Sequence, residues 1–465
     1  MAPTIEKPGL GSRLHLTRFD RVVWLILAVL LLLTMVVAVR GDQVGVQVLA
    51  VSPADNMTGV SSRAPLRITF DQEILLTGGM RVLNVEPIVS GTAQWEGATL
   101  VFYPSEPWPP DSTITATIPA GLEGKNGQKV RESVQWQFRT GHPRVLYMVS
   151  DSPERNQLML IDPRDDRPEA RRLTQEPYGV WDFAASPDGQ TIAYGALRED
   201  GGTDLWAISP DSGERRQLLA CPDASCSGPA WHPDGDRLIY ERRATSSIAG
   251  LAPSRLWWLD LSSGQTVPVF DDTQWLGFGA AISPDGRWLS HVAPHKQGVQ
   301  VYNFVDGRSL VVPSQLGEPA VWSPRSDFLL VGDVVTQEST FSEHIFRVNV
   351  ESGQAVDLSG PDTLRDSSPA WSPDGRSIAI DRADSVNAVA GRIWQLLATG
   401  GEGDPLTDEP NVRQGALSWS PDGRSLLFQR TFLQQLATAG VWLLDVQTGE
   451  ERLLAEQGAW PAWLP

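Results

Sequence analysis

One four-residue phrase recurs along this chain and constrains its fold more than any other feature. Pro-Asp-Gly follows a serine or a histidine at five places, and a degenerate copy, Ser-Pro-Arg-Ser, occurs once at residues 323–326. The five intact copies are at residues 186–189, 232–235, 283–286, 372–375 and 420–423. Successive prolines are 46, 51, 40, 49 and 48 residues apart. A period of about 40 to 50 residues is typical of repeat proteins, and four-stranded propeller blades and helix pairs are the leading candidates.

The residues around each phrase distinguish these two candidates. Pro-Asp-Gly forms a tight turn, because proline presets φ, aspartate accepts from nearby backbone N–H groups and glycine adopts positive φ at little cost. Short apolar runs flank the turn, such as 369–371 before it and 377–380 after it. A third run, such as 205–208, ends at a second glycine turn, and a fourth run follows. Four short strands at this period predict a β-propeller blade.

Residues 142–465 resemble the TolB-like propeller repeats, which carry a Trp-Ser-Pro-Asp-Gly signature. These repeats are related to WD repeats but lack the Gly-His and Trp-Asp markers. The resemblance implies a propeller fold and says little about activity, because propellers host many unrelated functions. Familiar TolB propellers have six blades, so a different blade count would weaken any transfer of their role.

The two ends of the repeat region predict the number of blades. Residues 461–465 align with 369–373, so the chain stops where another Pro-Asp-Gly turn would begin. Residues 142–147 enter the repeat just after such a turn. We therefore expect an all-β fold with a seven-bladed propeller, closed by pairing Trp463 with the strand at 145–148. Closure removes an exposed sheet edge.

The tryptophans that precede the turns indicate core packing. They occupy the same place in successive units, at Trp231, Trp322, Trp371, Trp419 and Trp463. A residue that recurs in register in every blade serves the contact between blades. We therefore expect these side chains to pack blade against blade, and not to form a platform for sugar stacking.

Residues 22–39 form an uninterrupted apolar run between Arg21 and Arg40. This length is about the minimum for a helix that spans a membrane. Basic residues precede the run, so the positive-inside rule predicts a cytoplasmic tail at 1–21 and extracytoplasmic domains beyond the helix. The alternative is a signal peptide cleaved near 36–38, although the apolar region of a signal is usually shorter. The sequence favours a single-pass anchor in the cell membrane.

The charge of the chain argues against some partners. Of the 38 Lys/Arg and 56 Asp/Glu, 5 and 2 lie in residues 1–41, so the remainder has 33 basic and 54 acidic residues, a net charge of −21. Nucleic acids and anionic lipids require basic patches. We therefore expect neither nucleic acid nor anionic lipid as a partner of these domains.

Cys221 and Cys226 are the only two cysteines of the sequence. Outside the cytoplasm, an isolated close pair most often forms a disulfide. A metal site would need further ligands, and none lies nearby in sequence. The pair therefore predicts a disulfide that closes a loop between the outer strand of one blade and the inner strand of the next.

Residues 43–141 do not show the repeat. They contain short alternating runs separated by turn signals, at 46–51, 66–70, 99–103, 113–118 and 134–138. About a hundred residues with this rhythm predict a β-sandwich. The segment also resembles bacterial Ig-like domains of the SbsA type, at Ser-Pro-Ala-Asp-Asn (52–56), Gly-Lys-Asn-Gly (124–127) and Trp-Gln-Phe-Arg-Thr-Gly (136–141). The resemblance implies a spacer or adhesion module that holds the propeller away from the membrane.

The sequence offers no catalytic motif. His291 and His295 form the only close histidine pair, and an alternating strand would not direct both at one ion. The run of aspartates at 162–166 lacks the glycine and glutamate of a calcium loop, and the Gly-x-Ser-x-Gly elbow of a hydrolase is missing. The carboxylates are too numerous to single out a glycosidase pair. We therefore predict no catalytic residue, no metal and no cofactor.

Loop lengths predict which face of the propeller binds a ligand. The turns between strands one and two and between strands three and four lie on one face and are uniformly tight. The long connections, including 242–255, 271–279, 333–343, 382–391 and 430–440, lie on the opposite face, which we call the loop face. Long loops on a rigid scaffold are where function usually resides. The predicted binding residues are Arg243, Arg255, Trp275, Phe278, Phe341, His344, Arg430 and Phe432.

These patterns together predict a membrane-anchored extracytoplasmic binding or scaffold protein. Its loop face would recognise a protein, a peptide or a cell-envelope glycan without catalysis. The alternative is a carbohydrate-active enzyme, a glycosidase or lyase, whose acidic residues converge in the propeller channel. A role in transmembrane signalling would require a partner helix, because the predicted tail is too short for an output domain.

Overall fold

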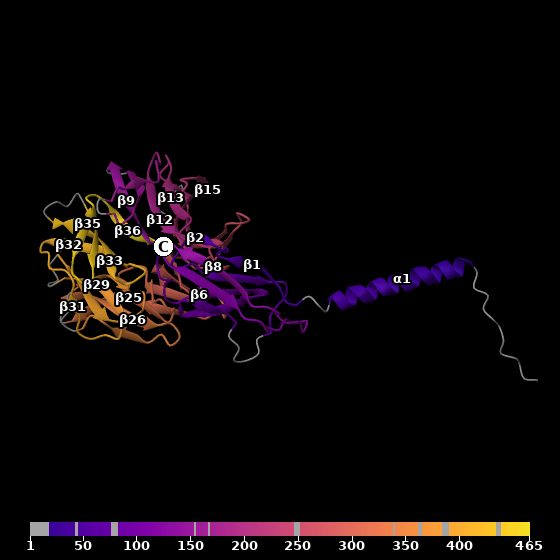
Figure 1. Ribbon diagram of the computed structural model, residues 1–465. Helices are drawn as coiled ribbons and strands as arrows, with labels where there is room; N and C mark the ends of the chain where they lie inside the picture. The colour runs from indigo at the N-terminus through magenta and orange to yellow at the C-terminus, as the bar shows by residue number, and fades with distance from the viewer. Residues whose placement is uncertain are drawn as a thin grey trace, which may run out of the picture.

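A computed structural model of the protein describes residues 18–41, 45–75, 82–152, 155–165, 168–245, 252–337, 340–360, 365–383, 390–433 and 439–465. One helix, α1 (Arg18–Gly41), stands apart from two β domains, a smaller one in purple and a larger one that runs from magenta to yellow (Figure 1). Within the described residues, no helix reaches the length and apolar character needed to cross a membrane. Most of the predicted tail, residues 1–17, lies outside the described residues.

The smaller domain is a sandwich of two four-stranded sheets. The first sheet has the order β1 (Val48–Ser52), β3 (Leu66–Phe70), β6 (Thr99–Pro104) and β5 (Gly91–Glu96). The second has the order β2 (Met57–Val60), β8 (Val134–Thr140), β7 (Thr113–Ile118) and β4 (Asn84–Glu86). All five predicted runs form strands, whereas β2, β4 and β5 were not predicted, because they are short or largely exposed.

Alternating side chains build the core of this sandwich. In β3, Leu66, Ile68 and Phe70 are buried while the residues between them are partly exposed, as a strand with one face on a core requires. Trp108 is fully buried at the centre, where its indole N–H donates to the Ala64 carbonyl at 2.9 Å. The hydrogen bond satisfies the one polar atom that this large side chain brings into the core.

The larger domain is a β-propeller whose described strands form units of four. The first four units are β36 (Ala459–Leu464), β9 (Arg144–Ser152), β10 (Arg155–Ile161) and β11 (Arg171–Arg172); β12 (Val180–Ala185), β13 (Ile192–Leu197), β14 (Thr203–Ile208) and β15 (Arg215–Leu219); β16 (Ala224–Trp231), β17 (Arg237–Ala244), β18 (Arg255–Asp260) and β19 (Thr266–Pro268); and β20 (Phe278–Ile282), β21 (Trp288–Ala293), β22 (Gly298–Asn303) and β23 (Ser309–Pro313).

Three further units complete the described strands. They are β24 (Val321–Trp322), β25 (Phe328–Gln337), β26 (Thr340–Asn349) and β27 (Ala355–Asp357); β28 (Arg365–Trp371), β29 (Ser377–Ala383), β30 (Arg392–Leu397) and β31 (Asp404–Pro405); and β32 (Val412–Trp419), β33 (Ser425–Phe432), β34 (Ala439–Asp445) and β35 (Glu451–Ala455). A single parallel pairing, Glu343 with Arg365, joins the first two of these units into one larger sheet.

The first strands of successive units are neighbours at the centre of the propeller. β12 contacts β16, and the series continues through β20, β24, β28 and β32 to β36. The last strand of the chain pairs with β9, in a register that sets Trp463 opposite Val145 and Leu464 opposite Arg144. This confirms the predicted pairing between the end of the chain and the start of the repeat region.

The Pro-Asp-Gly turns share one hydrogen-bond pattern. In the turn at 372–375, the Ser372 hydroxyl donates to the Asp374 carboxylate at 2.6 Å and accepts from the Ser377 N–H at 2.9 Å. The turns at 186, 283 and 420 repeat these bonds. In the degenerate copy, Ser326 adopts the positive φ (63°) that glycine adopts elsewhere, and its hydroxyl accepts from the Asp285 N–H. The turn therefore survives without its aspartate and glycine.

The repeated tryptophans connect neighbouring units as predicted. Each indole N–H donates to a backbone carbonyl on the first strand of the preceding unit; the donor–acceptor pairs are Trp231 to Ala184, Trp322 to Ala281, Trp371 to Val321, Trp419 to Ala370 and Trp463 to Ser418, at 3.1 to 3.3 Å. Trp463 makes the same contact as the others, which incorporates the C-terminal strand into the propeller.

The Ig-like sandwich lies on the turn face of the propeller, the face that carries the Pro-Asp-Gly turns. Side chains of the sandwich donate to backbone carbonyls in three successive turns: Ser61 to Pro187 at 2.7 Å, Arg67 to Asp234 at 3.1 Å and Gln94 to Asp285 at 3.0 Å. Glu106 and Pro107 also line a cavity of about 340 Å³ with the turns at 372–374 and 421–423. The sandwich thus extends across the turn face and leaves the loop face open.

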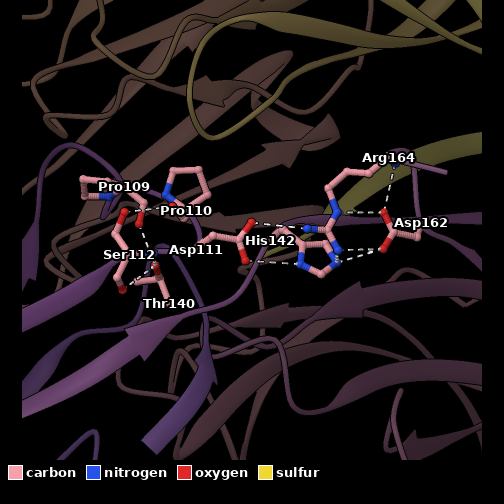
Figure 2. A network of polar contacts seen from close by, with 8 residues as sticks. All are labelled: Pro109, Pro110, Asp111, Ser112, Thr140, His142, Asp162 and Arg164. Atoms are coloured by element: carbon pink, nitrogen blue, oxygen red, sulfur yellow. Dashed lines mark hydrogen bonds and ion pairs between the residues drawn. The ribbon is translucent and has the colours of Figure 1, made fainter. Parts of the chain in front are cut away.

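Figure 2 shows the network that fixes the junction between the two domains. His142 Nε2 lies 2.8 Å from Asp162 of the propeller, and His142 Nδ1 lies 3.7 Å from Asp111 of the sandwich. Arg164 connects the same two carboxylates, at 3.3 Å from Asp111 and 3.2 Å from Asp162. Burial alone would raise the pKa of Asp162, but hydrogen bonds from Arg164 outweigh it and lower the pKa. Asp162, one of the aspartates excluded from a calcium loop by sequence, is therefore part of the junction.

Cys221 and Cys226 form the predicted disulfide. Cys221 follows β15, whereas Cys226 lies inside β16, so the bridge joins the connecting loop to the inner strand itself. Both residues are buried. Arg198 supports this loop, because its guanidinium donates to the Cys221 carbonyl at 2.7 Å and to the Ala224 carbonyl at 3.2 Å.

Replacing both cysteines by alanine is expected to lower the free energy of unfolding by about 2 kcal/mol, because the bridge closes only a short loop and restricts the unfolded chain little. Denaturant titration measures this, with parent and variant compared with and without a reductant. The reductant should destabilise the parent alone. Equal midpoints for the oxidised parent and the variant would contradict the prediction.

Candidate functional site

The predicted binding residues lie on strands and loops at the loop face, but they do not form one site. Much of the longest loops, residues 246–251, 338–339, 384–389 and 434–438, lies outside the described residues. The segment at 333–343 is not a loop where it is described: β25 and β26 extend through it, and Phe341 pairs with Thr336. A strand hairpin therefore projects from this unit.

Two of the predicted residues are buried and have internal partners. His344 is 1% exposed, and its Nδ1 lies 2.8 Å from the Asp357 carboxylate. Arg430 is 2% exposed, donates to Glu451 at 2.6 Å and lies over the Trp442 ring. Alternation along the strands turned both side chains inward, so neither is exposed on the loop face, contrary to the prediction.

The other six residues reach the surface in separate places. Arg243 and Phe278 line a cavity of about 330 Å³ together with His295. Arg255 donates to the Phe270 carbonyl at 3.3 Å, and Trp275 packs on Phe270 and under the ammonium group of Lys296. Phe341 and Phe432 are exposed in two other units. The structure brings Arg243 and Phe278 together but does not unite the six side chains in one site.

A different set of residues gathers at the centre of the propeller. Trp181 of β12 and Trp460 of β36 line a cavity of about 410 Å³, with Leu417 and Ala416 of β32. The two indoles are 61% and 57% exposed, although each lies on a central strand. The size is that of a small-molecule pocket, and its lining is mainly apolar. We call this cavity the tryptophan pocket.

A second cavity adjoins the tryptophan pocket. Its volume is about 530 Å³, and Trp460 and Ala416 line both. The other lining residues include Arg413, Gln429 and Thr431. We call this the polar pocket. The polar pocket has more side chains that can form hydrogen bonds than the tryptophan pocket, and Trp460 lines both cavities.

The backbone at this site is irregular in a repeated way. The pairing register shifts within the central strands, and the residue at the shift has positive φ in five of them: Gly228 (60°), Gly279 (63°), Ser368 (51°), Ala416 (49°) and Trp460 (48°). Trp181 holds the corresponding position in β12. Positive φ is costly for a residue other than glycine, and such strain concentrates at functional sites.

Trp460 is held in this conformation by a specific contact. Its backbone N–H donates to Oε1 of Gln429 at 3.1 Å. The side-chain oxygen of Gln429 thus accepts a hydrogen bond from the Trp460 N–H, a donor that the bulge removes from the ladder of the sheet. The indole is therefore presented by a fixed backbone.

Asp182 is the carboxylate that lines the tryptophan pocket. Its two oxygens accept from the Gly228 N–H at 2.5 Å and the Gly195 N–H at 3.2 Å. Burial raises its pKa to about 6, partly offset by these hydrogen bonds, while nearby Glu241 raises it further. Glu241 in turn accepts from the Gly279 N–H at 2.7 Å, and burial raises its pKa. Asp182 and Glu241 thus each accept a hydrogen bond from the bulged glycine in the first strand of the next unit.

A third buried carboxylate leads to a pH-dependent prediction. Burial raises the pKa of Asp381 to about 7, against about 3.9 in an unfolded chain, although Arg365 lies 3.3 Å away. Its contribution to stability is therefore present below pH 4 and is lost as the pH rises through 7. The parent loses this stability as the pH rises from about 4 to 7, whereas asparagine does not titrate. The free energy of unfolding of the Asp381→Asn variant should therefore rise relative to that of the parent by about 1.4 kcal/mol per pH unit across this range. Denaturant titrations at several pH values test this; a difference independent of pH would contradict it.

Comparison with known proteins supports both folds. Residues 42–140 match the family model described as a bacterial Ig-like domain. TolB from Acinetobacter baumannii is 14% identical over 83% of each chain, with a TM-score of 0.42. A prolyl endopeptidase is 14% identical over 75% of this chain and 49% of its own, and a puromycin hydrolase 18% identical over 69% and 54%, each with a TM-score of 0.50.

At these identities, the similarity to solved structures shows the fold alone. The chain spans only about half the length of the two enzymes. No curated protein matches the chain. The smaller domain is therefore a bacterial Ig-like domain and the larger one is a β-propeller with TolB-like structural neighbours; the narrower SbsA-type assignment stays a prediction.

Proposed function

We propose that this protein is a recognition protein without catalytic activity, which binds its ligand in the tryptophan pocket and the polar pocket at the loop face. The observation that carries the proposal is the pair of exposed indoles, Trp181 and Trp460, on neighbouring central strands. Large exposed aromatic side chains around a cavity are typical of binding sites. Sequence reasoning missed both, because neither belongs to the tryptophans that precede the turns or to the long loops that it selected.

The proposed scaffold is a closed propeller of seven blades on an Ig-like base. The seven units of strands, the contacts between successive central strands and the pairing of β36 with β9 support this arrangement. The sandwich covers the turn face, so a ligand would approach the channel from the loop face. A rigid ring holds the two indoles at a fixed separation.

Binding arrays test the proposal. The full chain is probed on a glycan array and a peptide array beside a Trp181→Ala/Trp460→Ala double variant and a Phe341→Ala control, an exposed aromatic residue of the loop face outside the pockets. We expect ligands that bind the parent and the control but not the double variant. Ligands bound equally by all three proteins would show that the site lies elsewhere.

The enzymatic alternative rests on Asp182, which lines the tryptophan pocket, and on the nearby Glu241, two carboxyl groups whose pKa values are raised by burial. Their oxygens are committed to backbone N–H groups, which favours a structural role. Assays for cleavage of the glycans that bind distinguish the two functions. Turnover by the parent that is lost in both Asp182→Asn and Glu241→Gln would replace recognition with catalysis.

We also propose that residues 22–39 anchor the protein in the cell membrane, with the two domains on the extracytoplasmic side. The uninterrupted apolar run and the basic residues before it support this. Mass spectrometry of the mature N-terminus from membrane fractions tests the anchor. A mature chain that begins near Val39 would identify a cleaved signal instead.

A further inference from the structure

We infer that the ligand of the two pockets is an oligosaccharide of pyranose sugars, and that sugars bearing a carboxylate bind best. This inference rests on the recognition function proposed above and specifies its ligand. It follows from the stacking surface of the indoles, the hydrogen-bonding groups beside them and the shape of the central strands.

The indoles provide an open stacking surface. Trp181 and Trp460 come from neighbouring blades and keep 61% and 57% of their surface exposed. A peptide side chain that anchors a complex usually enters an enclosed, desolvated pocket. A sugar ring instead has a flat face of C–H groups that buries well against a broad exposed indole, while its hydroxyls stay outside. The exposure of both rings therefore favours a sugar.

Trp460 lines both cavities, whose other side chains differ. Leu417, Phe183 and Met148 line the tryptophan pocket. Gln429 and Thr431 line the polar pocket. A chain of sugars that stacks on the indole would place its polar substituents among these amide and hydroxyl groups.

Arg413 gives the polar pocket its charge. The residue is exposed and lines the cavity. Its charge helps to lower the pKa values of the carboxyl groups of Asp381 and Glu318, against the larger effect of burial, and Arg365 acts in the same direction on Asp381. Arg413 is the charged side chain among the residues that line the polar pocket. A guanidinium binds a carboxylate in a bidentate manner, so Arg413 offers a local contact for an anionic sugar although the surrounding surface is acidic.

The central strands are poorly shaped for an extended peptide. A peptide that joins a sheet edge needs a regular ladder of N–H and C=O groups. Bulges interrupt the ladder in the central strands on both sides of the pocket, at Ala416 and at Trp460. Bulges are a known means of blocking edge pairing, so recognition here depends on side chains.

Intrinsic tryptophan fluorescence and titration calorimetry test the inference on the full chain. The probes are a hexasaccharide of uronic acids, a neutral hexasaccharide of N-acetylglucosamine and a mixture of extended peptides. We expect the acidic hexasaccharide to bind about tenfold more tightly than the neutral one, as one charge-assisted hydrogen-bonded contact allows. Arg413→Gln should abolish that preference, because it lowers the affinity for the acidic hexasaccharide more than the affinity for the neutral one. Trp460→Ala should weaken both about tenfold, and Phe341→Ala neither.

The outcomes separate this inference from the function on which it rests. Peptide binding that depends on Trp181 and Trp460, without saccharide binding, would overturn the oligosaccharide and leave the recognition function standing. Saccharide binding that is unaffected by Trp460→Ala would overturn both. Equal affinity for the two hexasaccharides in the parent would overturn the role of Arg413. Circular dichroism of each variant shows that the fold is intact.

Discussion

Removing residues 459–465 is expected to abolish the cooperative fold of the propeller. The deletion takes away β36, the central strand of the unit that also contains β9, and exposes the edge of β9. Leu464 is fully buried in a cluster with Leu146 of its own unit and Val180 of the next unit, and Trp463 donates to the Ser418 carbonyl of the preceding unit. Losing these contacts on both sides is expected to cost more than about 5 kcal/mol, which is comparable with the total stability of many domains.

Near-ultraviolet circular dichroism and calorimetry measure this effect, because the tryptophans of the propeller report its tertiary packing. The matched control is Trp460→Ala, which changes an exposed side chain of the same strand and should leave the unfolding temperature almost unchanged. A deletion variant that unfolds as cooperatively as the parent, at the same temperature, would show that β36 does not complete the ring. The Ig-like sandwich has its own core, so it is expected to stay folded.

Arg382→Ala is expected to destabilise the propeller by about 3 to 5 kcal/mol, the second of the two largest effects. Arg382 lies 2.6 Å from Asp366, whose side chain is fully buried, and it also lies over the ring of Trp394. Without the guanidinium, the carboxylate would stay in the interior with no cation to balance its charge. Proteins tolerate such an unpaired charge poorly, whatever the net value of the intact pair.

A surface pair in the same blade supplies the control for Arg382. Arg376 lies 3.9 Å from Asp374, and both side chains are exposed. Arg376→Ala should change the free energy of unfolding by less than about 1 kcal/mol, because solvent screens this pair. Denaturant titration of the two variants measures the contrast. Equal destabilisation by both substitutions would refute the assignment of Arg382 to a buried pair.

The repeat could be interpreted from sequence because its turns are local. Each Ser-Pro-Asp-Gly contains the donor, the acceptor and the positive-φ residue of its own turn, so four residues suffice to predict it. The pairing of Trp463 with β9 followed from the same phrase, since residues 461–465 align with 369–373, the residues that lead into the turn at 372–375. The disulfide was also predictable, because its partners are only five residues apart.

The candidate site was only partly predictable. Sequence reasoning chose the loop face as the binding face, which stays a prediction, but it assigned His344 and Arg430 to the surface, and both are buried. The direction of a side chain near the end of a strand depends on where the strand ends, and β25, β26 and β33 continue beyond the predicted limits. Trp181 and Trp460 were missed for a related reason: they do not recur in register with the turn tryptophans.

The sequence by itself therefore determined the repeated four-stranded units and the pairing of β36 with β9, because both depend on local turns and on a period that can be counted. Only the tertiary structure decided which tryptophans are exposed, which carboxylates support the central bulges and where the Ig-like domain lies. Those features depend on contacts between residues far apart in the chain, such as Ser61 with Pro187 and Gln429 with Trp460. No local pattern specifies such contacts, since they exist only after the ring has formed.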